Sequence, residues 1–251
     1  MRLVIIGNGF DRSINLPTGY DDFREYLEAN NKELFSCMED IYDNGYLWSD
    51  FENALGKPNI QFLKRLDTLF STDEIIDSSF VNKIKKIFNS WILSIDYSNH
   101  YPSKEYIIDN KSIYMSFNYT DTLSRIYGID MKNIFFVHGY AGQTLYGENL
   151  IFGHNNTINE LDLIRSTFKN TSEIIRNNLI WFKNLQLSNI DTIEIIGHSY
   201  NDIDYPYFQE IKKHCPKATW ILHAHSTKDE KHRENYIKRL DLKKYVKEIK
   251  K

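Results

Sequence analysis

Short clusters of glycine, asparagine, aspartate and histidine punctuate this sequence and could bind a phosphate or catalyse a hydrolysis. The first, Gly7-Asn8-Gly9-Phe10-Asp11, directly follows the aliphatic run Arg2–Ile6. Glycines at the end of a strand expose backbone N–H groups, and dinucleotide-binding folds hold a pyrophosphate at such a turn. The third glycine of the dinucleotide fingerprint would fall at Arg12, so the pattern is incomplete. A tight turn without a ligand is the alternative interpretation.

Polar clusters also follow the other aliphatic runs of the chain. They contain Asn118 and Thr120, His138 and Gly139, His154 and Asn155, Gly197 to Asp202, and His223 and His225. Because the carboxyl ends of parallel strands meet at one edge of a sheet, we expect these side chains to form a single surface. A lone histidine after a strand is usually structural, but several at one edge indicate a site.

Composition restricts the class of protein. The 251 residues are 41% hydrophobic and 26% charged, with a net charge of −3, which indicates a soluble chain and gives no general case for nucleic-acid binding. No apolar run could span a bilayer, and the N-terminus is expected to be a strand rather than a signal peptide. Cys37 and Cys215 are the only cysteines, which excludes a disulfide framework and a four-cysteine zinc module. We therefore expect a cytoplasmic protein.

Apolar runs alternate with helical patterns along the chain, which predicts an α/β fold: a Rossmann-like, doubly wound parallel sheet. The expected strands are Arg2–Ile6, Ser112–Phe117, Asn133–Val137, Thr192–Ile196, Thr219–His223 and Tyr245–Ile249. The expected helices include Tyr20–Leu27, Thr120–Tyr127, Asn159–Leu187, Tyr205–His214 and Asp229–Leu240.

A large helical insertion is expected at residues 32–97, between the first and second strands, because its apolar residues recur at helical spacing. Residues 1–31 and 98–251 would then form the α/β core. Such insertions often cover a ligand site, so we expect this one to act as a cap and to bring some of Trp48, Asp50 and Glu52 near the ligand. Trp48 and Phe51 are expected to be core residues.

Several motifs resemble the AbiH family of bacteriophage abortive-infection proteins. They are the opening Gly-Asn-Gly-Phe-Asp with Leu-Pro-Thr-Gly-Tyr-Asp-Asp-Phe, Trp48–Glu52, Ser-Phe-Asn-Tyr-Thr-Asp-Thr-Leu at 116–123, Val-His-Gly at 137–139, Phe-Gly-His-Asn at 152–155 and Ile-Gly-His-Ser-Tyr-Asn-Asp-Ile-Asp at 196–204. They occur in the same order as in that family and span almost the whole chain. The resemblance implies a role in phage defence.

A more distant resemblance is to the sirtuin (SIR2) fold, which binds NAD. The sirtuin opening motif aligns with residues 7–20, including Pro17, and Asn118, His138-Gly139 and Gly197-His198-Ser199 match later sirtuin motifs. Tyr20 and Thr120 replace a sirtuin arginine and aspartate, and the zinc ribbon cannot form with two cysteines. The departures argue against a protein deacylase and leave an NAD-consuming or nucleotide-binding SIR2-like core.

This resemblance implies hydrolysis of NAD, as substrate, to nicotinamide and ADP-ribose. Asn118 would orient the attacking water, and His138 would act as a base on the water or on a ribose hydroxyl. The residues implied in nucleotide binding are Gly7, Asn8, Gly9, Phe10, Asp11, Pro17, Gly197, His198, Ser199 and Asp202. A bulky β-branched residue at Gly9 is expected to block binding and leave the fold intact. We expect no metal and no membrane partner, and we expect a phage-derived trigger. The oligomeric state stays open, with a homo-oligomer as one alternative.

Three other functions compete with this one. Gly197-His198-Ser199-Tyr200-Asn201 is similar to a nucleophile elbow, with Asp204 or Asp229 and His223, His225 or His232 as triad partners, although Asn201 replaces the second glycine. A metal-dependent nuclease could use His154, His198, Asp202, His223 and His225, without a diagnostic spacing. A nucleotide-sensing or phage-protein-binding module would need no turnover. Assays for cleavage of NAD, an ester and nucleic acid separate these functions.

Overall fold

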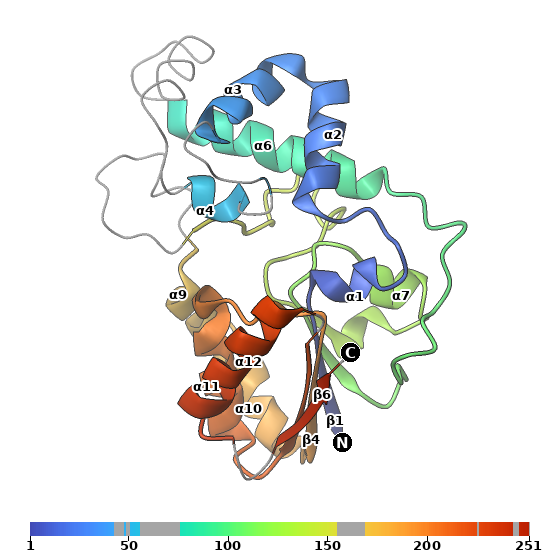
Figure 1. Cartoon of the computed structure of the whole chain (residues 1–251), viewed down its shortest axis with the longest axis vertical. Coiled ribbons are helices and arrows are strands. Elements are labelled where there is room, and N and C mark those ends of the chain that lie inside the picture. The colour runs from blue at the N-terminus through green and yellow to red at the C-terminus, as the bar shows by residue number, and fades with distance from the viewer. Residues whose placement is uncertain are drawn as a thin grey trace. The chain divides into compact units, whose positions relative to one another are not determined.

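The computed structural model describes residues 1–42, 48, 51–55, 76–154, 169–224, 226–242 and 246–250. The chain divides into two compact units (Figure 1). Unit 1 comprises Met1–Leu16, Tyr97–Val137 and Asn170–Lys251. Unit 2 comprises Pro17–Asp96 and His138–Lys169.

Among the described residues, unit 1 contains a six-stranded sheet in which every pair of neighbouring strands is parallel. The strands are β1 (Arg2–Ile6), β2 (Ile113–Ser116), β3 (Ile134–Phe136), β4 (Thr192–Ile196), β5 (Thr219–Ala224) and β6 (Val246–Lys250). Their order across the sheet is β3-β2-β1-β4-β5-β6. The chain builds one half of the sheet outward from β1 to β3, returns to the other side of β1, and adds β4 to β6. This arrangement confirms the predicted α/β fold with a parallel sheet.

The central position of β1 follows from its sequence. Leu3, Val4, Ile5 and Ile6 are all buried, as expected for a parallel strand that is covered on both faces. β1 pairs with β2 on one side and with β4 on the other, over almost its whole length. Its carboxyl end therefore lies where the strand order reverses.

Helices cover both faces of the sheet. Those of unit 1 are α1 (Asn8–Arg12), α7 (Thr122–Arg125), α9 (Thr171–Asn177), α10 (Leu179–Leu187), α11 (Tyr205–His214) and α12 (Thr227–Arg239), with 3₁₀ turns η2 (Met131–Asn133) and η3 (Asp202–Asp204). Figure 1 shows α10, α11 and α12 on one side of the sheet and α1 and α7 on the other. Helices on both faces are what a doubly wound sheet requires.

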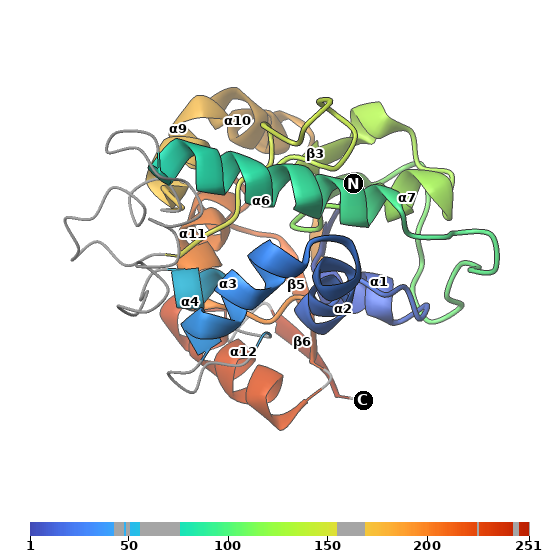
Figure 2. The same cartoon turned by 90° about the horizontal axis from the view of Figure 1, so that it is seen from above.

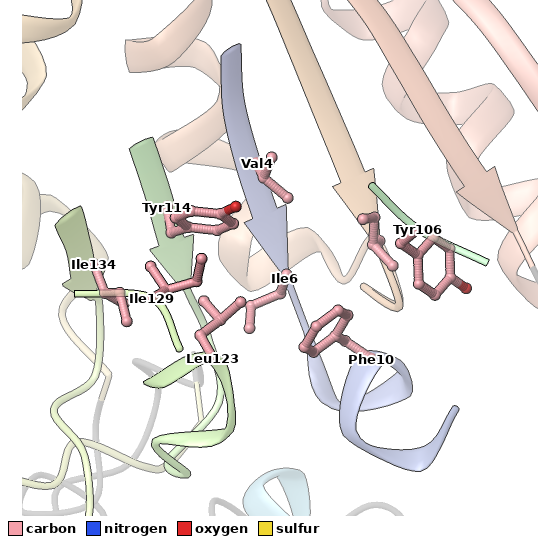
Figure 3. Close-up of a cluster of buried hydrophobic side chains, with 9 residues drawn as sticks. Val4, Ile6, Phe10, Tyr106, Tyr114, Leu123, Ile129 and Ile134 are labelled. Atoms are coloured by element: carbon pink, nitrogen blue, oxygen red, sulfur yellow. The ribbon is translucent and has the colours of Figure 1, made fainter. Parts of the chain in front are cut away.

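A buried hydrophobic cluster joins β1, β2 and β3 to α1 and α7 (Figure 3). Its members are Val4, Ile6, Phe10, Tyr106, Tyr114, Leu123, Ile129, Ile134 and Ile196. The Phe10 ring lies 5.0 Å from the Tyr127 ring and 6.1 Å from the Tyr106 ring, measured between centroids. Phe10, a predicted nucleotide-binding residue, is thus a core residue with 0% exposure.

The predicted single helix Asn159–Leu187 is wrong in its described part, where α9 and α10 are separated at Asn178. The Asn178 side chain donates a 2.8 Å hydrogen bond to the Ile174 carbonyl, and its backbone adopts a non-helical conformation. Asparagine side chains compete in this way with helical hydrogen bonds. The first ten residues of the predicted helix, 159–168, lie outside the described residues.

Unit 2 is helical in its described part, with α2 (Tyr20–Asn30), α3 (Lys32–Tyr42), α4 (Phe51–Leu55) and α6 (Ile76–Leu93). α2 packs against α3 and α6 (Figure 2). The Phe23 ring lies 5.6 Å from Phe51 and 5.1 Å from Phe88, and Trp48 is 6% exposed. The predicted core positions of Trp48 and Phe51 are confirmed. Asp50 and most of residues 43–75 lie outside the described residues, so a cap at 32–97 stays a prediction.

Within the described ranges, no helix combines the length and the apolarity that a membrane span requires.

Candidate functional site

The loops that follow β1 and β4 pack directly on each other through glycines. The Gly7 N–H donates to the Ile196 carbonyl at 3.0 Å, and the Gly9 N–H donates to the Gly197 carbonyl at 2.8 Å. A Cβ atom on Gly9 would lie 2.8 Å from Gly197 Cα, and one on Gly197 would lie 2.1 Å from the Phe10 nitrogen. No side chain fits at such distances, so this contact requires glycine.

This packing gives the Gly7–Gly9 motif a structural role. The amides of Gly7 and Gly9, expected to face a phosphate, instead bond the carboxyl end of β4. The expectation that a bulky residue at Gly9 leaves the fold intact is wrong, because its side chain would push the two loops apart. Asn8 is exposed at the first position of α1.

Asp11, in α1, is fully buried and bound to the loop that follows β2. Thr120 Oγ1 donates a 2.5 Å hydrogen bond to Asp11 Oδ2, and Thr122 Oγ1 donates to Thr120 Oγ1 at 3.1 Å. Burial raises the pKa of the Asp11 carboxyl from 3.8 to about 6, although hydrogen bonds from the neighbouring side chains oppose the shift. A carboxyl that titrates this close to neutrality is typical of acid–base sites.

Asn118 lies directly beside this carboxyl. Its side chain is 5% exposed, and its backbone N–H is held by Ser116 Oγ at 3.2 Å. The amide is close enough to lower the pKa of Asp11. Within the described part of the chain, however, Asn118 Nδ2, Asn118 Oδ1 and Asp11 Oδ1 make no hydrogen bond of normal geometry. Such groups cost about 1–3 kcal/mol each when they stay unpaired, so their presence points to a polar ligand.

The loop after β4 uses its histidine to hold its own shape. His198 Nδ1 accepts a 2.9 Å hydrogen bond from the Tyr200 N–H, which leaves Nε2 to face Asp204 Oδ2 at 3.3 Å. Tyr200 has a positive φ of 54°, and its hydroxyl donates to the His223 carbonyl at 2.6 Å. His198, a predicted nucleotide-binding residue, is therefore a buried loop-stabilising residue.

Ser199 and Asp202 are exposed in the same loop. The Asp202 carboxylate pairs with Arg239, and the Ser199 carbonyl faces His232 Nδ1 at 3.1 Å. No described histidine bonds the Ser199 hydroxyl, which a serine nucleophile would need. His225 lies outside the described residues.

His138 and Pro17 belong to unit 2, whereas Asp11 and Asn118 belong to unit 1. His138 is 2% exposed, and its carbonyl accepts a 2.9 Å hydrogen bond from the Ile151 N–H. The following Gly139 has a positive φ of 74°. The sheet edge of unit 1 thus brings together Asn118 and Asp11, and the role of His138 stays a prediction.

A family model described as bacteriophage abortive infection AbiH matches residues 3–224. The chain belongs to the AbiH family. The match begins in β1 and ends with β5, so it includes every loop discussed above. No curated protein matches the sequence. The family resemblance of the sequence motifs is confirmed.

Metal binding finds no support in the described part of this AbiH-family chain, where no three His, Cys, Asp or Glu side chains converge as a metal site. His154 is buried in unit 2, and its carbonyl accepts a 2.9 Å hydrogen bond from the Lys169 N–H. His223 Nε2 lies 2.9 Å from Glu194 Oε1. Asn155 lies outside the described residues.

The sequence motifs do not predict two partly buried networks of charged side chains. In unit 1, Glu194 bridges His223 and Arg2, with a distance of 3.2 Å to Arg2 Nη1. In unit 2, Glu52 accepts a 2.5 Å hydrogen bond from the Tyr20 hydroxyl and pairs with the buried Lys169 at 3.1 Å. A glutamate inside the apolar run of β4 is the one sequence feature that could have indicated the first network.

Proposed function

We propose that this AbiH-family protein hydrolyses NAD to nicotinamide and ADP-ribose at the carboxyl edge of the unit 1 sheet. The observation that carries the proposal is the buried Asn118 amide, which lies beside Asp11 and lacks a hydrogen-bond partner among the described residues. The family is one of phage abortive infection. Hydrolysis of NAD suits such a role, because loss of NAD would stop the metabolism of an infected cell.

The topology of the sheet supports a dinucleotide as substrate. The order β3-β2-β1-β4-β5-β6 is that of the doubly wound sheets that bind dinucleotides. In such sheets the ligand lies outside the carboxyl ends of the strands, where the order reverses, which here is beside β1. Those SIR2-like motifs that belong to unit 1, at Gly7–Gly9, Asn118 and Gly197–Ser199, follow β1, β2 and β4 at that edge. In this proposal, the exposed Asn8, Ser199 and Asp202 contact the phosphates or riboses.

The chemistry requires a water molecule held against the ribose carbon that carries nicotinamide. The bond between this carbon and the nicotinamide nitrogen breaks through an oxocarbenium-like state, and its electron pair leaves with the now neutral nicotinamide. Water supplies the hydroxyl of ADP-ribose and releases a proton. Asn118 can orient that water, because its amide offers both a donor and an acceptor.

His138 is proposed as a second acid–base residue, acting on a ribose hydroxyl. An imidazole has the intrinsic pKa for proton transfer near neutral pH. This assignment rests on the sirtuin-like His-Gly motif at 138–139. A phage-derived trigger belongs to the same proposal.

The test is a substrate panel for the purified full-length protein. NAD, a simple ester, single-stranded DNA and double-stranded DNA are incubated separately, and the products are separated by chromatography. Equal amounts of nicotinamide and ADP-ribose from NAD alone are expected. Ester cleavage would favour Ser199 as a nucleophile, and cut DNA would favour a nuclease. Binding of NAD without products would indicate a nucleotide-sensing module. Any of these three results, obtained without nicotinamide release, would overturn NAD hydrolysis.

A further inference from the structure

Buried polar atoms that lack a hydrogen-bond partner in the described structure gather at the carboxyl ends of β1 and β2. They are Asp11 Oδ1 and both polar side-chain atoms of Asn118. Asp11 is 0% exposed and Asn118 is 5% exposed, so bulk water does not satisfy these atoms. Two to four polar groups at one place are what a tightly held water molecule or a substrate hydroxyl requires.

We propose that Asp11 is the general base of this site and accepts a proton from the water molecule that Asn118 orients. The inference rests on the proposed NAD hydrolysis and assigns to Asp11 a role beyond nucleotide binding. The water oxygen forms the new bond to the ribose carbon, and nicotinamide leaves with the electrons of the old one. The released proton moves to Asp11 Oδ1 and then to solvent.

Two threonines position the carboxyl for this step. Thr120 Oγ1 accepts the hydrogen bond from Thr122, so its single hydrogen is directed to Asp11 Oδ2. One carboxylate oxygen is thereby held in place, and Oδ1 stays available for the water. Thr120 and Thr122 are positioning residues, since they act through Asp11.

The ionisation of Asp11 suits a base at neutral pH. Burial raises the pKa of its carboxyl to about 6, and the negative charge of Asp121 acts in the same direction. The hydrogen bond from Thr120 and the nearby polar side chains of Thr122 and Asn118 oppose this rise in the pKa. The carboxyl is therefore mostly ionised at neutral pH but basic enough to take a proton, which is the optimum for general base catalysis.

Among the described groups that most affect the pKa of Asp11, none is a cation. Tyr97 and Tyr127 lie close to its carboxyl, and burial raises the pKa of both phenols, so they stay neutral. Arg125, which interacts with Tyr97, bonds Asp121 at 2.6 Å. Within the described structure, Asp121 and its ion pair with Arg125 are thus charged groups that lie next to the site.

The pH profile of NAD turnover separates a catalytic Asp11 from one that only ties two loops together. The kcat/KM for nicotinamide release is measured across pH for the unmodified protein, Asp11→Asn and Asp130→Asn. Asp130 is an exposed matched control that bonds the Lys132 N–H at 3.1 Å. We expect the unmodified protein and Asp130→Asn to lose activity below about pH 6, the range in which Asp11 takes up a proton. Asp11→Asn should lose about 10²–10⁴-fold in kcat/KM and should lack this acidic limb.

A second variant keeps the test decisive if Asp11→Asn does not fold. Thr120→Val removes a hydrogen bond that lowers the pKa of Asp11, so the acidic limb should move to higher pH. An unmoved limb in folded Thr120→Val, or full activity of folded Asp11→Asn, would overturn the role of Asp11 alone. Absence of NAD turnover in the unmodified protein would instead overturn the proposed function, and the assigned base with it.

Discussion

The Thr120 hydroxyl donates a 2.5 Å hydrogen bond to the buried Asp11 carboxyl, 109 positions away, and so joins α1 to the loop that follows β2. α1 follows β1, and β1 and β2 are neighbours in the sheet. Asn118 belongs to the loop after β2, and its side-chain amide makes no hydrogen bond within the described part of the chain. This contact therefore places a carboxyl and an amide where an attacking water molecule could be held.

Stability should depend on pH through Asp11. The folded state raises the pKa of this carboxyl from 3.8 to about 6, so folding favours its protonated form. The stability that the protonated Asp11 carboxyl gives to the fold is fully present below pH 3.8, and it is lost as pH rises through about 6. The buried charge then destabilises the fold by up to about 3 kcal/mol. We expect Asp11→Asn to remove this loss and to melt at an equal or higher temperature than the unmodified protein at neutral pH.

The measurement is thermal unfolding on both sides of the transition near pH 6. Asp130→Asn serves as the control, because that carboxylate is exposed. The difference between Asp11→Asn and the unmodified protein should grow as pH rises. A lower melting temperature of Asp11→Asn at neutral pH would show that the ionised carboxylate is stabilising.

Gly197→Ala should destabilise the protein more than Gly128→Ala does. Both glycines have positive φ, 64° for Gly197 and 66° for Gly128, so both variants share the backbone strain. A Cβ on Gly197 would meet the Phe10 nitrogen at 2.1 Å, whereas a Cβ on Gly128 meets nothing within 4 Å. We expect a loss of about 1 kcal/mol at Gly128 and at least about 3 kcal/mol at Gly197, measured by urea unfolding. Equal losses would contradict the close packing of the two loops.

Glu194→Leu should destabilise unit 1, because Glu194 is 8% exposed and lies between Arg2 and His223. Removing Glu194 leaves His223 Nε2 without its hydrogen-bond partner and takes one of two carboxylates from Arg2, which also lies 3.6 Å from Asp109 Oδ2, so we expect a loss of about 1–3 kcal/mol. Urea unfolding measures the loss, with the exposed Asp130→Asn as a neutral control. A change of less than about 1 kcal/mol would mean that the network is structurally dispensable.

His138→Ala should lower NAD turnover by about 10²–10⁴-fold if His138 is the second acid–base residue. The double variant Asn118→Ala/His138→Ala should lose little more than either single variant, because both residues would act in one step. Nicotinamide release measures these rates, with thermal unfolding to exclude loss of fold. Full turnover by a folded His138→Ala variant would remove this assignment.

The strands could be predicted from the sequence because local composition determines them. The bounds of β1 and β4 agree with the predicted ranges Arg2–Ile6 and Thr192–Ile196, where apolar runs stop at glycine. The division between α9 and α10 was beyond this pattern. It depends on the hydrogen bond of a single asparagine, Asn178, inside a stretch of helical periodicity.

The candidate site could be predicted only in part, because its geometry depends on long-range contacts. The position of Asn118 and Asp11 at strand ends follows from local sequence. The hydrogen bond of Asp11 to Thr120 does not, since it requires β1 and β2 to be adjacent. For the same reason, the packing of Gly9 on Gly197 could not be predicted from the local sequence.

Nicotinamide release from NAD by the purified protein and by Asn118→Ala tests the central claim most directly. Asn184→Ala, at an exposed position in α10, is the matched control. We expect the unmodified protein and Asn184→Ala to release nicotinamide at equal rates, and a folded Asn118→Ala variant to be slower by about 10²–10⁴-fold. Equal rates for all three proteins, or no release by any of them, would contradict this claim.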